Sequence, residues 1–190
     1  MKAIIFDFYG VFCADVTMRW FEKNVPNHDE LAADFASICT QSDLGQLTKQ
    51  AFFEAFHDLV GIPTQVIMDG VKAEIVMNHD IIDLARSLKG RYKLGLMSNA
   101  TEEWLGELLR ENNMYDIFDS VVVSANIGIA KPDKGIYEHT LLQLGAEPAE
   151  TLFIDDRQVN VDAGNAYGIK SILYTDYESL VAQLAHEAIL

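Results

Sequence analysis

Short apolar segments recur along this chain with helical patterns between them, and this alternation restricts the fold more than any other feature of the sequence. Five segments rich in Val, Ile, Leu or Phe predict strands at Ala3–Phe8, Tyr92–Met97, Ser120–Val123, Thr151–Ile154 and Lys170–Tyr174. Helical patterns separate the last four, at Thr101–Asn112, Lys134–Leu144 and Val159–Tyr167. The alternation predicts an α/β fold, a Rossmann-like parallel five-stranded sheet flanked by helices with right-handed crossovers.

The stretch between the first two predicted strands interrupts this alternation. From about Asp15 to Asn78 the sequence has amphipathic runs but no convincing strand, and it predicts helices at Met18–Val25, Glu30–Ile38, Thr48–Leu59 and Thr64–Met77. A further helix near His79–Leu88 returns the chain to the sheet. We therefore expect an α/β core domain of residues 1–14 and 79–190, with an inserted helical cap domain of residues 15–78.

The charge balance of the chain is strongly acidic. Its 190 residues carry a formal net charge of −15, and the sequence pI is near 4.5. This charge repels nucleic acid and anionic membranes, so we expect neither as a partner. It also repels phosphate esters, so a phosphate site here needs local positive potential from a metal ion, a lysine or backbone N–H groups.

Location and redox state follow from absent signals. No apolar run reaches the roughly 18–20 residues that a membrane-spanning helix needs, and the chain leads from Met1 into the first predicted strand without a signal-peptide pattern. The two cysteines, Cys13 and Cys39, form no Cys-x-x-Cys pair, which favours reduced thiols. We expect a cytoplasmic protein, and the oligomeric state has no signature in the sequence.

Asp7 ends the first apolar segment, in the run Ile4-Ile5-Phe6-Asp7-Phe8-Tyr9-Gly10-Val11. An apolar run that stops at Asp-x-x-Gly predicts a buried parallel strand, a tight turn, and a carboxylate at the strand's carboxyl end. Open α/β sheets bind ligands at that edge. An aspartate in this place is either a turn former or a nucleophile.

Three later segments also place polar residues after apolar runs. They are Leu94-Gly95-Leu96-Met97-Ser98-Asn99, Gly128-Ile129-Ala130-Lys131-Pro132-Asp133 and Leu152-Phe153-Ile154-Asp155-Asp156-Arg157-Gln158-Val159-Asn160. The adjacent carboxylates of Asp155 and Asp156 are costly unless a cation or a proton neutralises the pair. Mg²⁺ is the simplest such cation, because it binds few protein carboxylates and keeps several waters.

In order along the chain, the motifs at Asp7, Ser98, Lys131 and Asp155-Asp156 resemble those of the haloacid dehalogenase superfamily, whose members are mostly phosphatases. The resemblance covers nearly the whole chain. It implies that Asp7 is a nucleophile that forms an aspartyl phosphate. It also implies that Ser98, Asn99 and Lys131 bind the phosphoryl group of a small phosphorylated metabolite.

The same resemblance implies a Mg²⁺ site. Its ligands would be Asp7, the backbone carbonyl of Tyr9, Asp155 and Asp156. Asn160 would hydrogen-bond to these ligands without contacting the metal itself. Asp156 matches the family's most common direct ligand, and Asp155 binds either directly or through water. A backbone carbonyl survives any side-chain replacement, so Tyr at position 9 does not by itself remove the metal.

Tyr9 departs from the phosphatase pattern. Phosphatases of this family usually have a second Asp there, which protonates the leaving oxygen and then activates water. A phenol with a pKa of about 10 is a poor general base at neutral pH, and lost acid–base catalysis costs about 10²–10⁴ in rate. Tyr9 stays a catalytic candidate beside Asp7 and Lys131, while His28, His57 and His79 are candidate replacements for the missing acid.

Three functions remain open from the sequence. The leading one is a Mg²⁺-dependent phosphatase, because the run from Asp155 to Gly168 resembles that of sugar phosphatases such as α-glucose-1-phosphate phosphatase. With Tyr9 in place of the second Asp, we expect it to be slow on alkyl phosphates. The second is a metal-independent 2-haloacid dehalogenase, since those enzymes have Tyr at the position of Tyr9 but uncharged residues in the fourth motif. The third is a catalytically weak phosphate-binding or regulatory protein.

Overall fold

The computed structural model describes all 190 residues as an α/β fold built on one parallel sheet. The strand order is β3-β2-β1-β4-β5, and every neighbouring pair is parallel. The strands are β1 (Ala3–Phe6), β2 (Lys93–Ser98), β3 (Ser120–Val123), β4 (Thr151–Asp155) and β5 (Lys170–Leu173). The predicted fold class is confirmed. Each strand lies within two residues of its predicted bounds.

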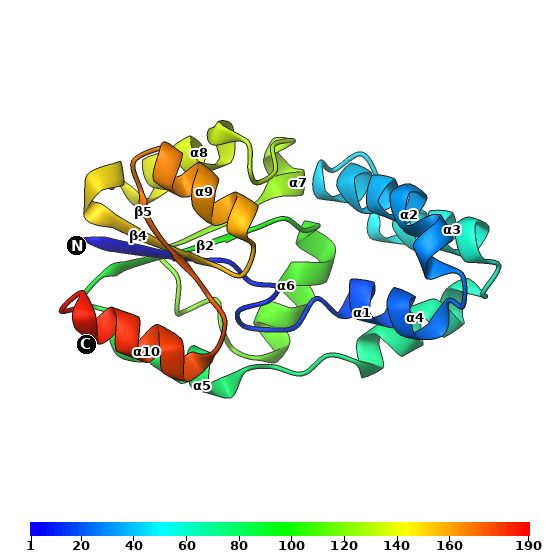
Figure 1. Ribbon diagram of the computed structural model, residues 1–190, viewed down its shortest axis with the longest axis horizontal. Helices are drawn as coiled ribbons and strands as arrows, with labels where there is room; N and C mark the ends of the chain where they lie inside the picture. Colours follow the sequence, from blue (N-terminus) through cyan, green and yellow to red (C-terminus); the bar gives the residue numbers. More distant parts are fainter.

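Helices cover both faces of the sheet (Figure 1). One face packs on α5 (His79–Leu88), α6 (Glu102–Glu111) and α10 (Tyr177–His186), and the other on α8 (Lys134–Leu144) and α9 (Gln158–Ala166). All four residues of β1 are buried, with Ile4 facing the first layer and Ile5 the second. Such burial on both faces is typical of a central parallel strand. No helix combines the length and the apolar composition that crossing a bilayer requires.

Residues 15–78, which we call the helical insertion, lie at one end of the sheet (Figure 1). Their helices are α1 (Val16–Asn24), α2 (His28–Asp43), α3 (Lys49–Val60) and α4 (Thr64–Ala73). These helices pack around buried aromatic rings. The ring centroid of Phe35 lies 4.1 Å from that of Phe21 and 4.6 Å from that of Phe56. The division into a core domain and a cap domain stays a prediction.

The insertion departs from its predicted helices in two places. Helix α2, predicted to end at Ile38, continues to Asp43 and therefore reaches the sheet. The helix predicted over Thr64–Met77 ends at Ala73, and Met77 instead forms an antiparallel bridge with Cys13. Outside the insertion, the sequence prediction missed α10, the short helix α7 (Ser124–Ile127) and a 3₁₀ turn at Pro148–Glu150.

The end of α2 is attached to the core by close polar and backbone contacts. The hydroxyl of Ser124, directly after β3, donates to the backbone oxygen of Asp43 at 2.6 Å and accepts from the backbone N–H of Ala100 at 3.1 Å. Gly45 has a φ of +71°, and a Cβ there would lie 2.3 Å from the carbonyl oxygen of Ala125. The chain around Asp43 is therefore held against the carboxyl ends of β2 and β3.

We expect Phe56→Ala to destabilise the protein strongly. Phe56 is fully buried in the insertion, in contact with Trp20, Phe21 and Phe35. The truncation should lower the free energy of unfolding by about 3–5 kcal/mol in a urea titration. The exposed Val66→Ala on α4 is the control and should change it by less than about 0.5 kcal/mol. Equal effects of the two changes would show that the aromatic cluster does not stabilise the insertion.

Candidate active site

The topology gathers the predicted site residues at one edge of the sheet. From β1 the chain builds β2 and β3 on one side, then crosses to build β4 and β5 on the other. The crevice beyond the carboxyl end of β1 is therefore the topological switch point, where open α/β sheets bind ligands. Asp7 follows β1 directly, Ser98 ends β2, and Asp155 ends β4.

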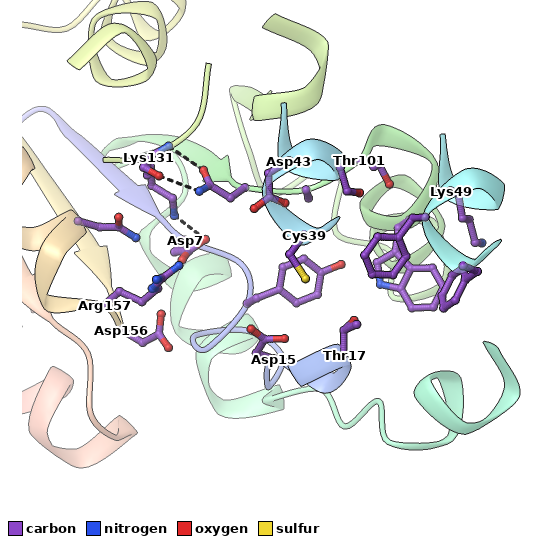
Figure 2. A pocket seen from close by; sticks show the side chains of 18 residues that line it. Asp7, Asp15, Thr17, Cys39, Asp43, Lys49, Thr101, Lys131, Asp156 and Arg157 are labelled. Carbon is purple, nitrogen blue, oxygen red and sulfur yellow. Dashed lines mark hydrogen bonds and ion pairs between the residues drawn. The ribbon is translucent and has the colours of Figure 1, made fainter. Parts of the chain in front are cut away.

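A buried lysine lies between two of the aspartates. The ammonium group of Lys131 is 2.8 Å from Oδ1 of Asp7 and 2.7 Å from Oδ2 of Asp155. The three side chains are 1%, 7% and 0% exposed, respectively. Figure 2 shows Lys131 reaching toward Asp7 along a dashed contact. Charges buried this deeply are tolerated only when they are paired.

Asn99 positions the backbone of Lys131. The side-chain amide of Asn99 donates to the carbonyl oxygen of Lys131 at 2.9 Å, and its carbonyl oxygen accepts from the backbone N–H of Lys131 at 2.8 Å. This pair of bonds joins the loop after β2 to the loop that carries the lysine. Asn99, predicted to bind phosphate, thus has a positioning contact as well as a place in the pocket lining.

The charges of the ion triad formed by Lys131, Asp7 and Asp155 favour a protonated lysine. Burial alone would lower the pKa of Lys131, but the carboxylates of Asp7 and Asp155 outweigh it and raise that pKa. Burial raises the pKa of Asp7 well above its ordinary value, which Lys131 only partly offsets. Burial also opposes the ionisation of Asp155, yet Lys131 and hydrogen bonds lower its pKa overall. An added cation is what would stabilise the ionised form of Asp7.

Asp155 and Asp156 have different surroundings. Both carboxylate oxygens of Asp155 accept the side-chain amide of Asn160, at 2.9 and 3.1 Å, and one also accepts the backbone N–H of Arg157 at 2.8 Å. No side-chain hydrogen bond engages the carboxylate of Asp156, which lies so close to Gly10 that a Cβ there would be 2.1 Å from it.

The three aspartates fit a divalent cation. Asp7, Asp155 and Asp156 each offer an oxygen, and these oxygens all lie within 4.8 Å of one another. A cluster of hard oxygen donors suits Mg²⁺. The free carboxylate is that of Asp156, while Asp155 already accepts donors at both oxygens, so Asp156 is the better direct ligand.

The other two predicted site residues have buried hydroxyl groups without a hydrogen-bond partner. The hydroxyl of Ser98 lies at the end of β2, and that of Tyr9 in the turn after β1. Tyr9 lines the pocket, whereas Ser98 does not. Burial, followed by the charges of Cys13, Asp15, Asp43 and Asp7, raises the pKa of the Tyr9 phenol well above its ordinary value. The phenol therefore stays neutral and keeps its proton.

A cavity of about 170 Å³ lies between the core and the helical insertion. Asp7, Lys131 and Asp156 line it from the core (Figure 2). Sequence reasoning missed several polar lining residues: Asp15, Thr17, Asp43, Lys49, Thr101 and Arg157. His28, His57 and His79 are absent from the lining.

Aromatic side chains line the end of the cavity that lies opposite Lys131 and Asp7. Phe52 and Phe53 of α3 and Trp104 of α6 line it, and the ring centroids of Phe53 and Trp104 are 5.7 Å apart. The ammonium group of Lys49 lies 4.7 Å from the centroid of Trp104 and pairs with Glu107 at 2.7 Å. Figure 2 places Lys49 at the side of the pocket opposite Lys131 and Asp7. Phe52 and Phe53 pack against each other and also line the cavity.

Curated relatives include both phosphatases and dehalogenases. The chain is 37% identical over 94 residues to a sesquiterpene phosphatase of Aspergillus oryzae, which is 49% of this chain and 48% of the relative. It is 25% identical over 195 residues to (S)-2-haloacid dehalogenase 4A of Burkholderia cepacia, covering 90% of this chain and 82% of the relative. The chain spans about half the length of the sesquiterpene phosphatase, and less of some other curated relatives.

Solved structures share the fold at low identity. A HAD-like family hydrolase of Porphyromonas gingivalis aligns with a TM-score of 0.80 at 22% identity, over 99% of this chain and 98% of that one. A HAD family enzyme of Bacteroides thetaiotaomicron, in complex with magnesium and inorganic phosphate, aligns with a TM-score of 0.77 at 22% identity, over 95% and 98%. The family model for haloacid dehalogenase-like hydrolases matches residues 1–168, and the chain therefore belongs to this family of hydrolases.

Proposed function

We propose that this hydrolase is a Mg²⁺-dependent phosphatase that cleaves a small phosphorylated metabolite through an aspartyl phosphate on Asp7. One observation carries the proposal. Lys131 lies between Asp7 and the fully buried Asp155, while the carboxylate of Asp156 is free beside them, and Asp7, Lys131 and Asp156 line one pocket. With a cation held by the aspartates, this arrangement would place two positive groups, the cation and Lys131, where a phosphoryl group would meet the nucleophile.

In the first step, one carboxylate oxygen of Asp7 attacks phosphorus and the bond to the leaving oxygen breaks. Oδ1 of Asp7 already accepts from Lys131 and from the backbone N–H of Phe8, so Oδ2 is the free nucleophile. Lys131 stabilises charge on the phosphoryl oxygens, and Asn99 lines the pocket beside the buried Ser98 at the end of β2. In the second step water attacks the aspartyl phosphate and regenerates Asp7.

We propose Asp7, Asp156 and the backbone carbonyl of Tyr9 as the metal ligands, with Asp155 acting directly or through water and Asn160 orienting it. When bound, Mg²⁺ would supply charge that keeps Asp7 ionised and neutralises phosphoryl oxygens. Support comes from the cluster of oxygens and from the magnesium and phosphate bound to the Bacteroides thetaiotaomicron neighbour. We propose residues 15–78 as the cap that covers this site.

The aromatic end of the cavity favours an apolar leaving group. Phe52, Phe53 and Trp104 offer ring faces and few hydrogen-bond donors, so burying a hydrocarbon or aryl group there is favourable and burying sugar hydroxyls is not. The sesquiterpene phosphatase among the relatives agrees with such a substrate. The sugar phosphate that the sequence resemblance implied stays a prediction to be tested beside it.

A 2-haloacid dehalogenase is the second candidate, and Tyr9 is the observation that favours it. Its reaction would use Asp7 to attack carbon, without metal and without a proton for the departing halide. The free Asp156 weighs against it, because Lys131 already pairs with Asp155 and no side chain pairs with the adjacent carboxylate of Asp156, which a cation would neutralise. Halide release from 2-chloropropionate that persists in chelator would establish the dehalogenase.

We expect phosphatase turnover to require Asp7 and Mg²⁺. A panel of phosphate esters assayed with Mg²⁺ should give phosphate release that chelator abolishes. Asp7→Asn should abolish it as well, because a neutral amide cannot attack phosphorus. Asp116→Asn, at a solvent-exposed position outside the helical insertion, is the matched control. Turnover that survives Asp7→Asn contradicts the mechanism. Measurable phosphate and Mg²⁺ binding with no turnover across the panel would indicate the regulatory alternative.

Gly10→Ala tests the metal site without changing a ligand. The added methyl group would displace the carboxylate of Asp156, so we expect Mg²⁺ affinity, measured by calorimetry, to fall at least about tenfold. Gly61→Ala is the control, since Gly61 also has a positive φ but no atom within 4 Å of its added Cβ. Equal Mg²⁺ affinity in both variants would show that Asp156 does not bind the metal.

Trp104→Ala tests the aromatic wall. We expect kcat/KM for an isoprenyl or aryl phosphate to fall about tenfold to a hundredfold, because a buried ring contributes about 1.5–3 kcal/mol of apolar contact. The value for α-glucose 1-phosphate, the polar reference in the same assay, should change little. A preference of the unmodified protein for the sugar phosphate would contradict the assignment of this wall to the leaving group.

A further inference from the structure

The proposed reaction moves a proton twice, and no group yet described can do so. The leaving oxygen needs a proton in the first step, and water must lose one in the second. The phenol of Tyr9 can donate a hydrogen bond, but its raised pKa prevents it from serving as a base at neutral pH. The histidines are elsewhere: the ring of His28 bonds the carbonyl of Val25, and that of His57 bonds the carbonyl of Ile62.

Asp43 is the carboxyl group that the fold brings to the side of the pocket opposite Asp7. It ends α2 and lines the main cavity with Asp7 and Tyr9. It also lines a second, neighbouring hollow together with Lys131 and Asn99. Figure 2 shows Asp43 in the insertion, across the pocket from Asp7, which directly follows β1. In-line attack by Asp7 directs the leaving oxygen away from the core, toward this side.

The position of Asp43 is fixed to the core rather than to the insertion alone. Its backbone oxygen accepts the Ser124 hydroxyl at 2.6 Å, and the neighbouring Gly45 packs on the carbonyl of Ala125. A proton-transfer group must lie within hydrogen-bond reach of the reacting oxygen, so such an anchor matters for an acid that comes from an insertion. No side-chain hydrogen bond engages the carboxyl group of Asp43, which leaves it available to a substrate.

The surroundings of Asp43 suit both protonation states. Burial raises the pKa of its carboxyl group to about 7, and the nearby charge of Asp15 adds to the rise, while Lys131 and Arg157 lower it. Asp7, Tyr9, Cys39, Lys49 and Asp156 are the other titratable groups that line the cavity, and burial raises the pKa of the Cys39 thiol to about 12. A general acid–base group works best with a pKa near the operating pH. Cys39, by contrast, would keep its proton.

Asp15 is the competing carboxyl group in the same pocket. It is exposed, and one of its oxygens accepts the backbone N–H of Met18 at 3.2 Å, which makes it the N-cap of α1. An exposed, capping carboxylate has an ordinary structural role. Asp43 has no such role for its side chain and lies deeper, between the two hollows that meet at Lys131.

We propose that Asp43 is the general acid and base of this hydrolase, taking from the insertion the role that Tyr9 cannot perform in the turn after β1. This inference rests on the proposed phosphatase function. As Asp7 attacks and the P–O bond to the leaving group breaks, the Asp43 carboxyl group gives its proton to the leaving oxygen and becomes a carboxylate. That carboxylate then takes a proton from water as the water oxygen attacks phosphorus, the bond to Asp7 breaks, and phosphate leaves.

The kinetic test compares two leaving groups in Asp43→Asn, with Asp34→Asn on the exposed face of α2 as the matched control. For an alkyl phosphate, which needs the proton, kcat/KM should fall about 10²–10⁴-fold. For p-nitrophenyl phosphate, which does not, kcat/KM should change by less than roughly threefold while kcat falls, because the second step slows. A burst of nitrophenol should then precede the slow steady state.

A pH profile of the unmodified protein provides an independent readout. With the alkyl phosphate, kcat/KM should decline as pH rises above about 7, because Asp43 loses the proton it must donate; with p-nitrophenyl phosphate this decline should be absent. The free energy of unfolding should also depend on Asp43. Because folding raises the pKa of its carboxyl group, the fold loses stability as the pH rises toward the folded-state pKa. The stability of Asp43→Asn relative to wild type should therefore increase between about pH 4 and pH 7 and stay constant above that range.

The outcomes separate this inference from the proposed function. If wild type hydrolyses alkyl phosphates, Asp7→Asn is inactive, and Asp43→Asn stays within roughly threefold of wild type, Asp43 is not the acid–base group and the phosphatase stands. If wild type and Asp34→Asn hydrolyse no phosphate ester, the proposed function fails. If Asp43→Asn does not fold, the two pH profiles decide, and identical profiles for both leaving groups overturn the inference.

Discussion

The buried ammonium group of Lys131, between the carboxylates of Asp7 and Asp155, is the interaction on which the site depends. Removing one partner of a buried ion pair costs about 3–5 kcal/mol, because it leaves an uncompensated charge. The neighbouring contacts hold this arrangement in place. Asn99 fixes the backbone of Lys131, and Asn160 fixes the carboxylate of Asp155. The strand order brings these groups together, because it places β1 between β2 and β4.

The core and the helical insertion contribute different chemistry to one cavity. The core supplies charged groups at the carboxyl ends of β1 and β4 and the ring of Trp104, whereas the insertion supplies Asp43 from α2 and two phenylalanine rings from α3. The join between the two parts is tight at the end of α2, where Ser124 bonds the backbone of Asp43. Groups presented from the insertion can thus have fixed positions relative to Asp7. Substitutions in α2 and α3 should alter specificity and proton transfer without disturbing the ion triad.

The sequence predicted the strands and the core half of the site because both have local signals. Asp7 and Asp155 directly follow apolar runs, and their neighbours mark the turns. The contact between Asn99 and Lys131 joins residues 32 apart and has no local signal. The extension of α2 to Asp43 was missed because its end is set by packing on Ser124. Helix α10 was overlooked although Asp176 caps it and Leu180 and Leu184 form a buried stripe.

The central claim is that Asp7 takes up the phosphoryl group. Rapid acid quenching of the protein during turnover of a phosphate ester with Mg²⁺, followed by trypsin digestion and mass spectrometry, tests it most directly. The account predicts phosphate bound covalently to Asp7, in the peptide that begins at Ala3 and ends at Arg19. Turnover without any phosphorylated peptide, or with the phosphate on another residue, would contradict it.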